Sequence, residues 1–275
     1  MTTPLHPAPG QSREDRADLE AREDREAREA REAREAREAR RAFLAGRLAA
    51  VRERIADAAR AAGRDHTGIT LITVTKTWPA EDVRLLAGLG VRDVGENQDQ
   101  QASAKAAACA GLAPALSWHF IGQLQSNKAP SVARYADMVH SVDRASLVSA
   151  LGKAAERAGR AERELRCLIQ VSLDGTAGRG GAHPDEVLRL AALIAGRPGL
   201  TVAGVMAVAP PQEPAGEAFA RLRPVRERLL GEHPGAVVMS AGMSGDLEAA
   251  IAAGATHVRV GSAILGHRPP APLPH

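Results

Sequence analysis

The sequence has few aromatic residues, few cysteines and no long apolar segment. Aromatic side chains make up 2% of the 275 residues, so a protein that stacks nucleic-acid bases on aromatic rings is not expected. Cys109 and Cys167 are too few for a disulfide framework and lack the spacing of metal ligands, which indicates a reduced, cytoplasmic protein without a metal site. No apolar run approaches the ~18 to 20 residues of a membrane helix, and no signal segment is evident, so neither a membrane nor export is indicated.

Lysine is also scarce, although basic residues are common. The 36 basic residues nearly balance the 33 acidic ones, and a net charge of +3 gives no reason to expect a nucleic-acid partner. Only four of the basic residues are lysines, namely Lys76, Lys105, Lys128 and Lys153. Because a lysine amine forms imines and a guanidinium does not, each of these positions is a candidate site at which an amine is required.

Residues 1–41 differ in composition from the rest of the chain. The triplet Arg-Glu-Ala repeats from Arg25 to Arg40, and no large apolar residue lies between Leu19 and Phe43. Such a segment has no side chains with which to build a core. We expect a solvated helix or a disordered arm. A nucleic-acid-binding arm is an alternative, but interleaved Arg and Glu leave little net positive potential.

From residue 42 onward, short apolar runs alternate with segments of helical period. The runs predicted as strands are 69–75, 91–94, 117–121, 138–142, 165–171, 202–208, 236–239 and 257–260. Residues 184–195 have apolar side chains at i, i+3, i+4 and i+7 and are typical of the intervening helices. Asp143 and Ser244 are predicted helix N-caps, and Gly254 is predicted to have a positive φ after a helix.

This alternation predicts an α/β fold of the (β/α)8 TIM-barrel type. Eight strand and helix units fit residues 42–268, followed by a Pro-rich tail at 269–275. We therefore expect no second domain. A doubly wound open sheet is the alternative, but the first strand is not followed by the glycine pattern of a dinucleotide site.

In a barrel the active site lies at the C-terminal ends of the strands, and Lys76 follows the first strand there. The alternative interpretation of Lys76 is an ordinary surface lysine. The scarcity of lysine in this sequence and the position of Lys76 favour an imine-forming amine. Gly261 and Ser262 follow the eighth strand and Ser244 follows the seventh, which is where barrels commonly bind phosphate. These residues are also ordinary turn formers. Arg259 alternates with two valines in the eighth strand and is predicted to face the opposite way, into the barrel.

An amine, a phosphate cradle and an inward guanidinium together describe a site for an aldehyde that carries a phosphate. Pyridoxal 5'-phosphate (PLP) meets all three requirements. A guanidinium keeps its proton, so a pyridine nitrogen that accepts from Arg259 is unprotonated and the ring is a weak electron sink.

Several segments resemble the pyridoxal phosphate homeostasis proteins. They are VTKTWP around Lys76, VGEN ending at Asn97, WHFIGQLQSNK at 118–128, GVMAVAP from Gly204 and SAGMSGDLEAAIAAGATHVRVGSAILG from Ser240. The resemblance covers about residues 45–268. It implies a barrel similar to the N-terminal domain of alanine racemase.

The resemblance also implies roles for individual residues. Lys76 would hold PLP as an internal aldimine, Arg259 would contact the pyridine nitrogen, and Asn97 would lie beside the cofactor. The phosphate would be held by Ser244, Gly261 and Ser262. Ser240 and Met206 complete the expected cofactor-binding set, and no catalytic residue is expected.

The sequence departs from the family pattern at three positions. Gln98 and Gln101 stand where an aromatic and an acidic residue are usual. A basic position of the fifth loop is replaced within the segment DGTAGRGG, where Arg179 is a candidate to compensate. The motif residues His119 and Lys128 are interpreted either as cofactor contacts or as a hydrogen-bonded core histidine and a solvated lysine.

The expected function is binding and delivery of PLP without turnover, by a monomer whose candidate recipients are PLP-dependent apoenzymes. Racemases of this fold use a second domain to place a base across the cofactor, and no such domain is expected here. A low-activity amino-acid racemase is the alternative, although the single tyrosine, Tyr135, is predicted on a helix away from the barrel mouth. A third reading, a Schiff-base aldolase for sugar phosphates, would place its lysine later in the chain.

Overall fold

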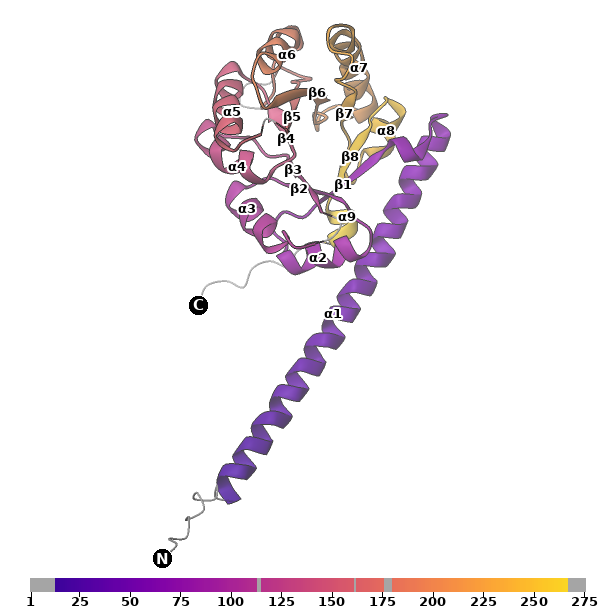
Figure 1. Ribbon diagram of the computed structural model, residues 1–275. Helices are drawn as coiled ribbons and strands as arrows, with labels where there is room; N and C mark the ends of the chain where they lie inside the picture. The colour runs from indigo at the N-terminus through magenta and orange to yellow at the C-terminus, as the bar shows by residue number, and fades with distance from the viewer. Residues whose placement is uncertain (1–12, 113–114, 161, 176–179, 267–275) are drawn as a thin grey trace, which may run out of the picture. The chain divides into compact units, whose positions relative to one another are not determined.

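Eight parallel strands form a closed barrel, with helices between them (Figure 1). The computed structural model describes residues 13–112, 115–160, 162–175 and 180–266, with side chains from residue 22. The strands are β1 (Thr70–Val74), β2 (Asp93–Glu96), β3 (Ser117–Phe120), β4 (Met138–Val142), β5 (Leu165–Gln170), β6 (Leu200–Met206), β7 (Val238–Ser240) and β8 (His257–Val260). Each strand pairs with the next, and β8 pairs with β1. The predicted barrel is confirmed and the open-sheet alternative is wrong. Arg179 and the tail at 269–275 lie outside the described residues.

The helices follow the predicted alternation. They are α2 (Ala80–Gly88), α3 (Asp99–Ala108), α4 (Ala129–Tyr135), α5 (Ala145–Arg157), α6 (Val187–Ala195), α7 (Ala215–Glu232), α8 (Leu247–Ala252) and α9 (Ser262–Leu265), with short 3-10 turns η1 (His66–Gly68), η2 (Ser126–Lys128) and η3 (Pro184–Glu186). The helix predicted over 184–195 is therefore η3 followed by α6. Gly254 has φ +103°, which confirms the predicted left-handed turn after α8.

Two strands begin two residues later than predicted. Val91 was predicted to open the second strand, but its amide donates to the Leu86 carbonyl at 3.0 Å and closes α2. The strand β2 instead continues through Gly95, where an added Cβ would lie 3.0 Å from Cγ2 of Ile72. A glycine permits this close approach between strands, so it marks tight packing here and not a break. The seventh strand likewise begins at Val238, after the predicted 236.

Both predicted helix caps are wrong. The N-cap of α5 is Arg144, and the Asp143 carboxylate accepts from the Arg144 guanidinium at 2.6 Å. The N-cap of α8 is Asp246, whose carboxylate accepts from the Met243 amide at 2.5 Å. The hydroxyl of Ser244 is therefore not used to cap α8, and it lies against the loop that follows β8.

The helix α1 (Arg13–Ala61) contains residues of two compact units, which divide between Phe43 and Leu44. In the second unit its buried side chains recur every three or four residues, at Leu44, Leu48, Val51, Ile55 and Ala59. This stripe packs against Leu86 of α2 and Val258 of β8, and each large apolar side chain contributes about 1.5 to 3 kcal/mol by burial.

In the first unit, residues 22–39 of α1 are exposed. Arg31 pairs with Glu35 at 2.9 Å and Arg34 with Glu38 at 3.0 Å, one helical turn apart. Such pairs each contribute about 0.3 to 0.5 kcal/mol to a helix. Of the two forms expected for residues 1–41, the helix is the one found over residues 13–41.

The barrel strands alternate between an outer and an inner face. Val258 and Val260 belong to the outer apolar cluster under α1 and α8. Arg259 lies between them in sequence and faces the barrel interior, where it contacts Ser240. The predicted inward direction of Arg259 is confirmed. An inner apolar cluster comprises Met138, Leu168, Ala203, Met206 and Val238.

Candidate functional site

Lys76 lies two residues beyond the end of β1, at the C-terminal mouth of the barrel. Its side chain is exposed, and within the described part of the chain its amine has no hydrogen-bond or ion-pair partner. The next residue, Thr77, has φ +69°, a left-handed conformation that is uncommon for a threonine. The Thr77 amide donates to the side chain of Gln101 at 3.3 Å, and Gln101 donates to Gln98 at 2.8 Å. The two glutamines that depart from the family pattern therefore support the turn that carries the amine.

A buried ion pair lies behind Lys76. The amine of Lys105 donates to the Glu96 carboxylate at 2.6 Å and to the Thr75 carbonyl at 2.7 Å. The Thr75 hydroxyl donates to the same Glu96 oxygen at 2.6 Å. All three side chains are buried, and they tie the residue before Lys76 to β2 and α3. Sequence reasoning identified Lys105 only as a scarce lysine and did not predict this pair.

The loops after β7 and β8 meet beside the end of β1. The hydroxyls of Ser244 and Ser262 are 3.4 Å apart, and the Ala263 amide lies 3.5 Å from the Ser244 hydroxyl. A Cβ at Gly261 would lie 3.1 Å from the Val74 carbonyl oxygen, so the loop after β8 lies against the strand that leads to Lys76. The structure thus brings the three residues predicted to bind phosphate close together.

Two arginines of α1 contact the loop after β7 and the short helix α9 after β8. Arg47 donates to the carbonyl of Ala263 at 2.8 Å and to that of Ser262 at 3.3 Å. Arg54 donates to the carbonyl of Ser244 at 3.1 Å and pairs with Glu248 at 2.7 Å. Sequence reasoning missed both arginines. Their seven-residue spacing on one helix face was the available signal.

Arg259 lies inside the barrel near the mouth and is 4% exposed. Its Nη1 donates to the Ser240 hydroxyl at 2.7 Å, and its Nη2 donates to the Ala207 carbonyl at 3.0 Å. Burial lowers the pKa of Arg259 to about 10, while the Asp246 carboxylate acts in the opposite direction. The guanidinium therefore remains a cation near neutral pH.

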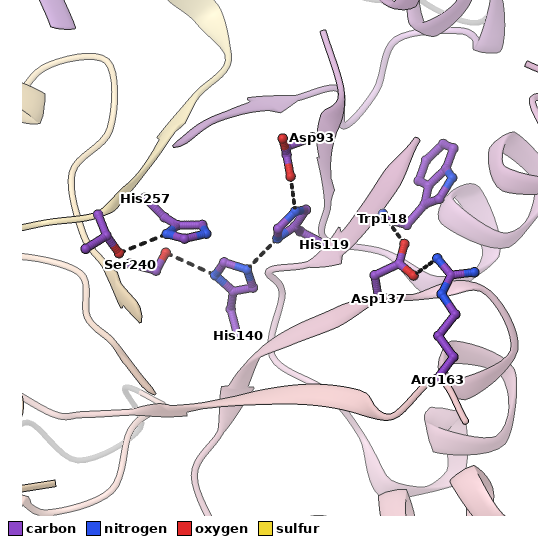
Figure 2. A network of polar contacts seen from close by, with 9 residues as sticks. Asp93, Trp118, His119, Asp137, His140, Arg163, Ser240 and His257 are labelled. Atoms are coloured by element: carbon purple, nitrogen blue, oxygen red, sulfur yellow. Dashed lines mark hydrogen bonds and ion pairs between the residues drawn. The ribbon is translucent and has the colours of Figure 1, made fainter. Parts of the chain in front are cut away.

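Behind Ser240, histidines continue the polar contacts through the barrel (Figure 2). Nδ1 of His140 lies 3.0 Å from the Ser240 hydroxyl, and Nε2 of His140 lies 3.0 Å from Nδ1 of His119. Nε2 of His119 lies 2.9 Å from the Asp93 carboxylate at the start of β2. His119 is thus the hydrogen-bonded core histidine of the two interpretations, and Lys128 is exposed on η2. Sequence reasoning did not single out His140 or Asp93.

The remaining predicted residues have different surroundings. Met206 is buried in the inner cluster and pairs in register with Ser240. Asn97 follows β2, and its backbone packs on Gly122, where an added Cβ would lie 2.2 Å from the Asn97 carbonyl oxygen. Within the described residues, no hydrogen bond joins Asn97 to the other predicted site residues. It lines a hollow of about 500 Å³ that also includes Lys128.

Taken together, the mouth has a primary amine without a partner among the described residues, two neighbouring hydroxyls beside Gly261, and a buried cation. These groups suit a ligand with an electrophilic carbon, an anionic end and a hydrogen-bond acceptor. In the described ranges no cluster of three metal-ligating side chains occurs. None of the helices in those ranges is both long and apolar enough for a membrane span.

Comparison with known proteins places this geometry in context. Residues 46–269 match the family "Alanine racemase, N-terminal domain". A pyridoxal phosphate homeostasis protein of Mycobacterium tuberculosis is 45% identical over 236 residues, which cover 80% of this chain and 91% of that protein.

Solved structures include a relative with PLP bound and more distant proteins of the same fold. PipY of Synechococcus elongatus PCC7942, in a structure with PLP bound, has a TM-score of 0.70 and 32% identity, covering 81% of this chain and all of that one. An alanine racemase of Corynebacterium glutamicum has a TM-score of 0.58 and 16% identity over 86% of this chain and 63% of its own. The racemase likeness concerns the fold alone.

Proposed function

This chain belongs to the family of pyridoxal phosphate homeostasis proteins, and we propose that it holds PLP through Lys76 and serves intracellular PLP homeostasis without catalytic turnover. The observation that carries the proposal is the Lys76 amine, which lies just beyond β1, has no partner among the described residues, and lies beside the glycine and serine segments after β7 and β8. When bound, PLP supplies an aldehyde that condenses reversibly with a primary amine.

The residues at the mouth fit this cofactor. Only two of the five N–H groups of Arg259 contact acceptors among the described residues, although the side chain is buried. Donors therefore remain for a pyridine nitrogen. The hydroxyls of Ser244 and Ser262, with the backbone at Gly261, are suited to a phosphate, because glycine allows amides to approach an anion closely.

The proposed roles follow from these positions. Lys76 provides the amine, Arg259 orients the ring nitrogen, and Ser244, Gly261 and Ser262 hold the phosphate. Met206 and Ser240 form the floor below the ring, since both are buried at the ends of β6 and β7. Asn97 borders the mouth on the side of β2.

The charge on Arg259 supports carriage of the cofactor over catalysis. A guanidinium whose pKa is about 10 donates hydrogen bonds and does not protonate its acceptor at neutral pH. The ring nitrogen then stays unprotonated and withdraws few electrons, so carbanions are poorly stabilised. We therefore propose no catalytic residue. PLP-dependent apoenzymes remain the candidate recipients, and the chain is proposed to act as a monomer.

A low-activity amino-acid racemase is the alternative, with Lys76 as the base on one face. Such a reaction needs a proton donor on the other face. Tyr135 ends α4 and packs against the outer cluster that contains Val94 and Trp118. Burial, together with the Asp99 carboxylate, raises its pKa above the usual range. A hydroxyl with a raised pKa gives up its proton less readily, so Tyr135 is poorly suited to this role.

The compartment is a further part of the proposal. Cys109 and Cys167 are both buried and unpaired, which fits the reducing cytoplasm that we propose.

Absorption spectra and turnover assays test the proposed function together. The wild-type protein mixed with PLP is expected to gain a visible band, and Lys76→Ala is expected to lose it. Lys128→Ala, which removes another exposed lysine near the mouth, is the control and is expected to keep the band. No racemisation of alanine is expected. A protein that stays colourless would favour a sugar-phosphate aldolase, and Lys76-dependent racemisation would establish the alternative.

A further inference from the structure

Four hydrogen bonds join the proposed ring-nitrogen partner to the opposite end of the barrel. They run from Arg259 to Ser240 (2.7 Å), from Ser240 to His140 (3.0 Å), from His140 to His119 (3.0 Å) and from His119 to Asp93 (2.9 Å). Figure 2 shows the part of this chain between Ser240 and Asp93. The strands β8, β7, β4, β3 and β2 each contribute one residue.

The two ends of the chain determine its direction. Arg259 is only a donor and the Asp93 carboxylate only an acceptor. Neutral His119 must therefore donate from Nε2 to Asp93, which leaves its Nδ1 to accept from His140. Neutral His140 then donates from Nε2, so its own Nδ1 accepts from the Ser240 hydroxyl. Ser240 in turn accepts from Arg259. One arrangement of protons satisfies every bond.

The surroundings keep His140 neutral. His140 is fully buried and His119 is 3% exposed. Burial lowers the pKa of His140 well below its usual value, and the facing groups His119, Arg259, His257 and Arg166 lower it further.

We propose that Ser240, His140 and His119 are positioning residues that orient Arg259 toward the cofactor ring, and that Asp93 fixes the direction of their hydrogen bonds. This proposal rests on the proposed function, because it assigns Arg259 to the ring nitrogen. Among the described residues Arg259 has one side-chain acceptor, Ser240. When the Ser240 hydroxyl donates to Nδ1 of His140, its lone pairs are left to accept from Arg259. The far end of the barrel thereby sets the hydrogen bonding of the mouth.

The barrel also contains a matched control. His257 lies in the same interior, with its ring centroid 6.4 Å from that of His119. Its Nδ1 contacts the Thr256 hydroxyl at 2.9 Å, so it is outside the chain of hydrogen bonds. Replacing His257 perturbs the interior without breaking this chain.

The first experiment uses the full chain without cofactor. Nitrogen NMR of the protein with labelled histidines, near pH 7, is expected to show a proton on Nε2 and none on Nδ1 for both His119 and His140. Replacing Asp93 by alanine removes the terminal acceptor and is expected to give a mixture of tautomers. A proton on Nδ1 of either ring in the wild type, or two protons on one ring, would overturn the proposal.

The second experiment uses the PLP-loaded protein. His140→Leu is expected to shift the wavelength of the visible absorption band, whereas His257→Leu is expected to leave that wavelength unchanged. Both variants are expected to retain the covalent adduct at Lys76. If the band shifts in neither variant, or shifts equally in both, the chain of hydrogen bonds does not position Arg259. If His140→Leu fails to fold, the histidine tautomers that NMR finds in the wild-type protein test the proposal. Failure of the wild type to bind PLP would contradict the proposed function, while the NMR result would still test the hydrogen-bond chain.

Discussion

Arg47 donates to the carbonyl oxygen of Ala263 at 2.8 Å, although 216 residues separate the two in the sequence. This contact joins the start of the barrel domain to the loop after its last strand. By binding the carbonyls of Ser262 and Ala263, Arg47 holds the first turn of α9, whose N-terminal end carries Gly261 and the Ser262 hydroxyl. Arg54 likewise binds the carbonyl of Ser244.

Replacing Arg47 or Arg54 by alanine is therefore expected to weaken phosphate binding. A lost hydrogen bond of this type costs about 1 kcal/mol, which corresponds to roughly fivefold weaker PLP binding. Pyridoxal lacks the phosphate, so its affinity should change little. Titration of both vitamers by absorbance measures the difference. Arg52→Ala is the control, because among the described residues the Arg52 guanidinium has one hydrogen-bond acceptor, the Leu89 carbonyl at 3.5 Å. Equal losses for both vitamers would show that the arginines act on the fold as a whole.

The buried pair of Glu96 and Lys105 predicts a large loss of stability when one partner is removed. Lys105→Met leaves the Glu96 carboxylate buried without its cation, and such losses cost about 3 to 5 kcal/mol. Changing Glu96 to Gln in the same chain should recover part of the loss. Urea unfolding measures both. Arg223→Ala, which breaks an exposed pair with Glu227, is expected to cost less than about 1 kcal/mol. A similar small cost for Lys105→Met would contradict this account of the pair.

The two parts of α1 are expected to differ in their importance for the barrel. Deleting residues 1–41 removes exposed triplets, so PLP binding and the thermal midpoint should be retained. Leu48→Ala removes a buried side chain that is 1% exposed and should cost about 2 to 5 kcal/mol in the free energy of unfolding. Calorimetry of the two proteins compares them. A marked loss of PLP binding on deletion would give the arm a structural role.

His257 predicts a pH dependence of stability. Burial lowers its pKa to about 4, with His119 and Arg166 adding to the effect. Between pH 6.5 and 4 the unfolded chain binds the proton more readily, so the stability present above pH 6.5 is lost as the pH falls. The shift corresponds to roughly 3 kcal/mol. Urea unfolding at several pH values should show a smaller loss for His257→Gln. His66→Gln, at an exposed position, should leave the loss unchanged, and an equal slope in His257→Gln would refute the assignment.

The fold could be predicted from the sequence because strands and helices produce local patterns of apolar residues. Strand runs and helical periods recur eight times, and alternation along β8 predicted the inward direction of Arg259, which is confirmed. Strand boundaries were less accurate, and the second strand was predicted to end at residue 94, before Gly95. Gly95 lies inside β2 because a neighbouring strand needs the space. Helix caps failed for a related reason, since Ser244 contacts a loop that is distant in sequence.

Sequence motifs identified those candidate site residues that lie within short contiguous segments. Lys76, Ser244, Gly261 and Ser262 lie in segments that resemble a known family, and the structure brings three of them together. His140 and Asp93 were missed because their importance depends on contacts across several strands. The alternation argument used for Arg259 applies equally to His140 in β4. Arg47 and Arg54 were missed because their contacts on the segments after β7 and β8 include backbone carbonyls, and the residue type that supplies a carbonyl is not visible in a sequence pattern.

Reduction of the PLP-loaded protein with borohydride, followed by mass analysis of its peptides, tests the central claim most directly. The account predicts one stable adduct, on the peptide that contains Lys76, and none on the peptides of Lys105, Lys128 or Lys153. An adduct at one of those three lysines, or no adduct after saturation with PLP, would contradict it.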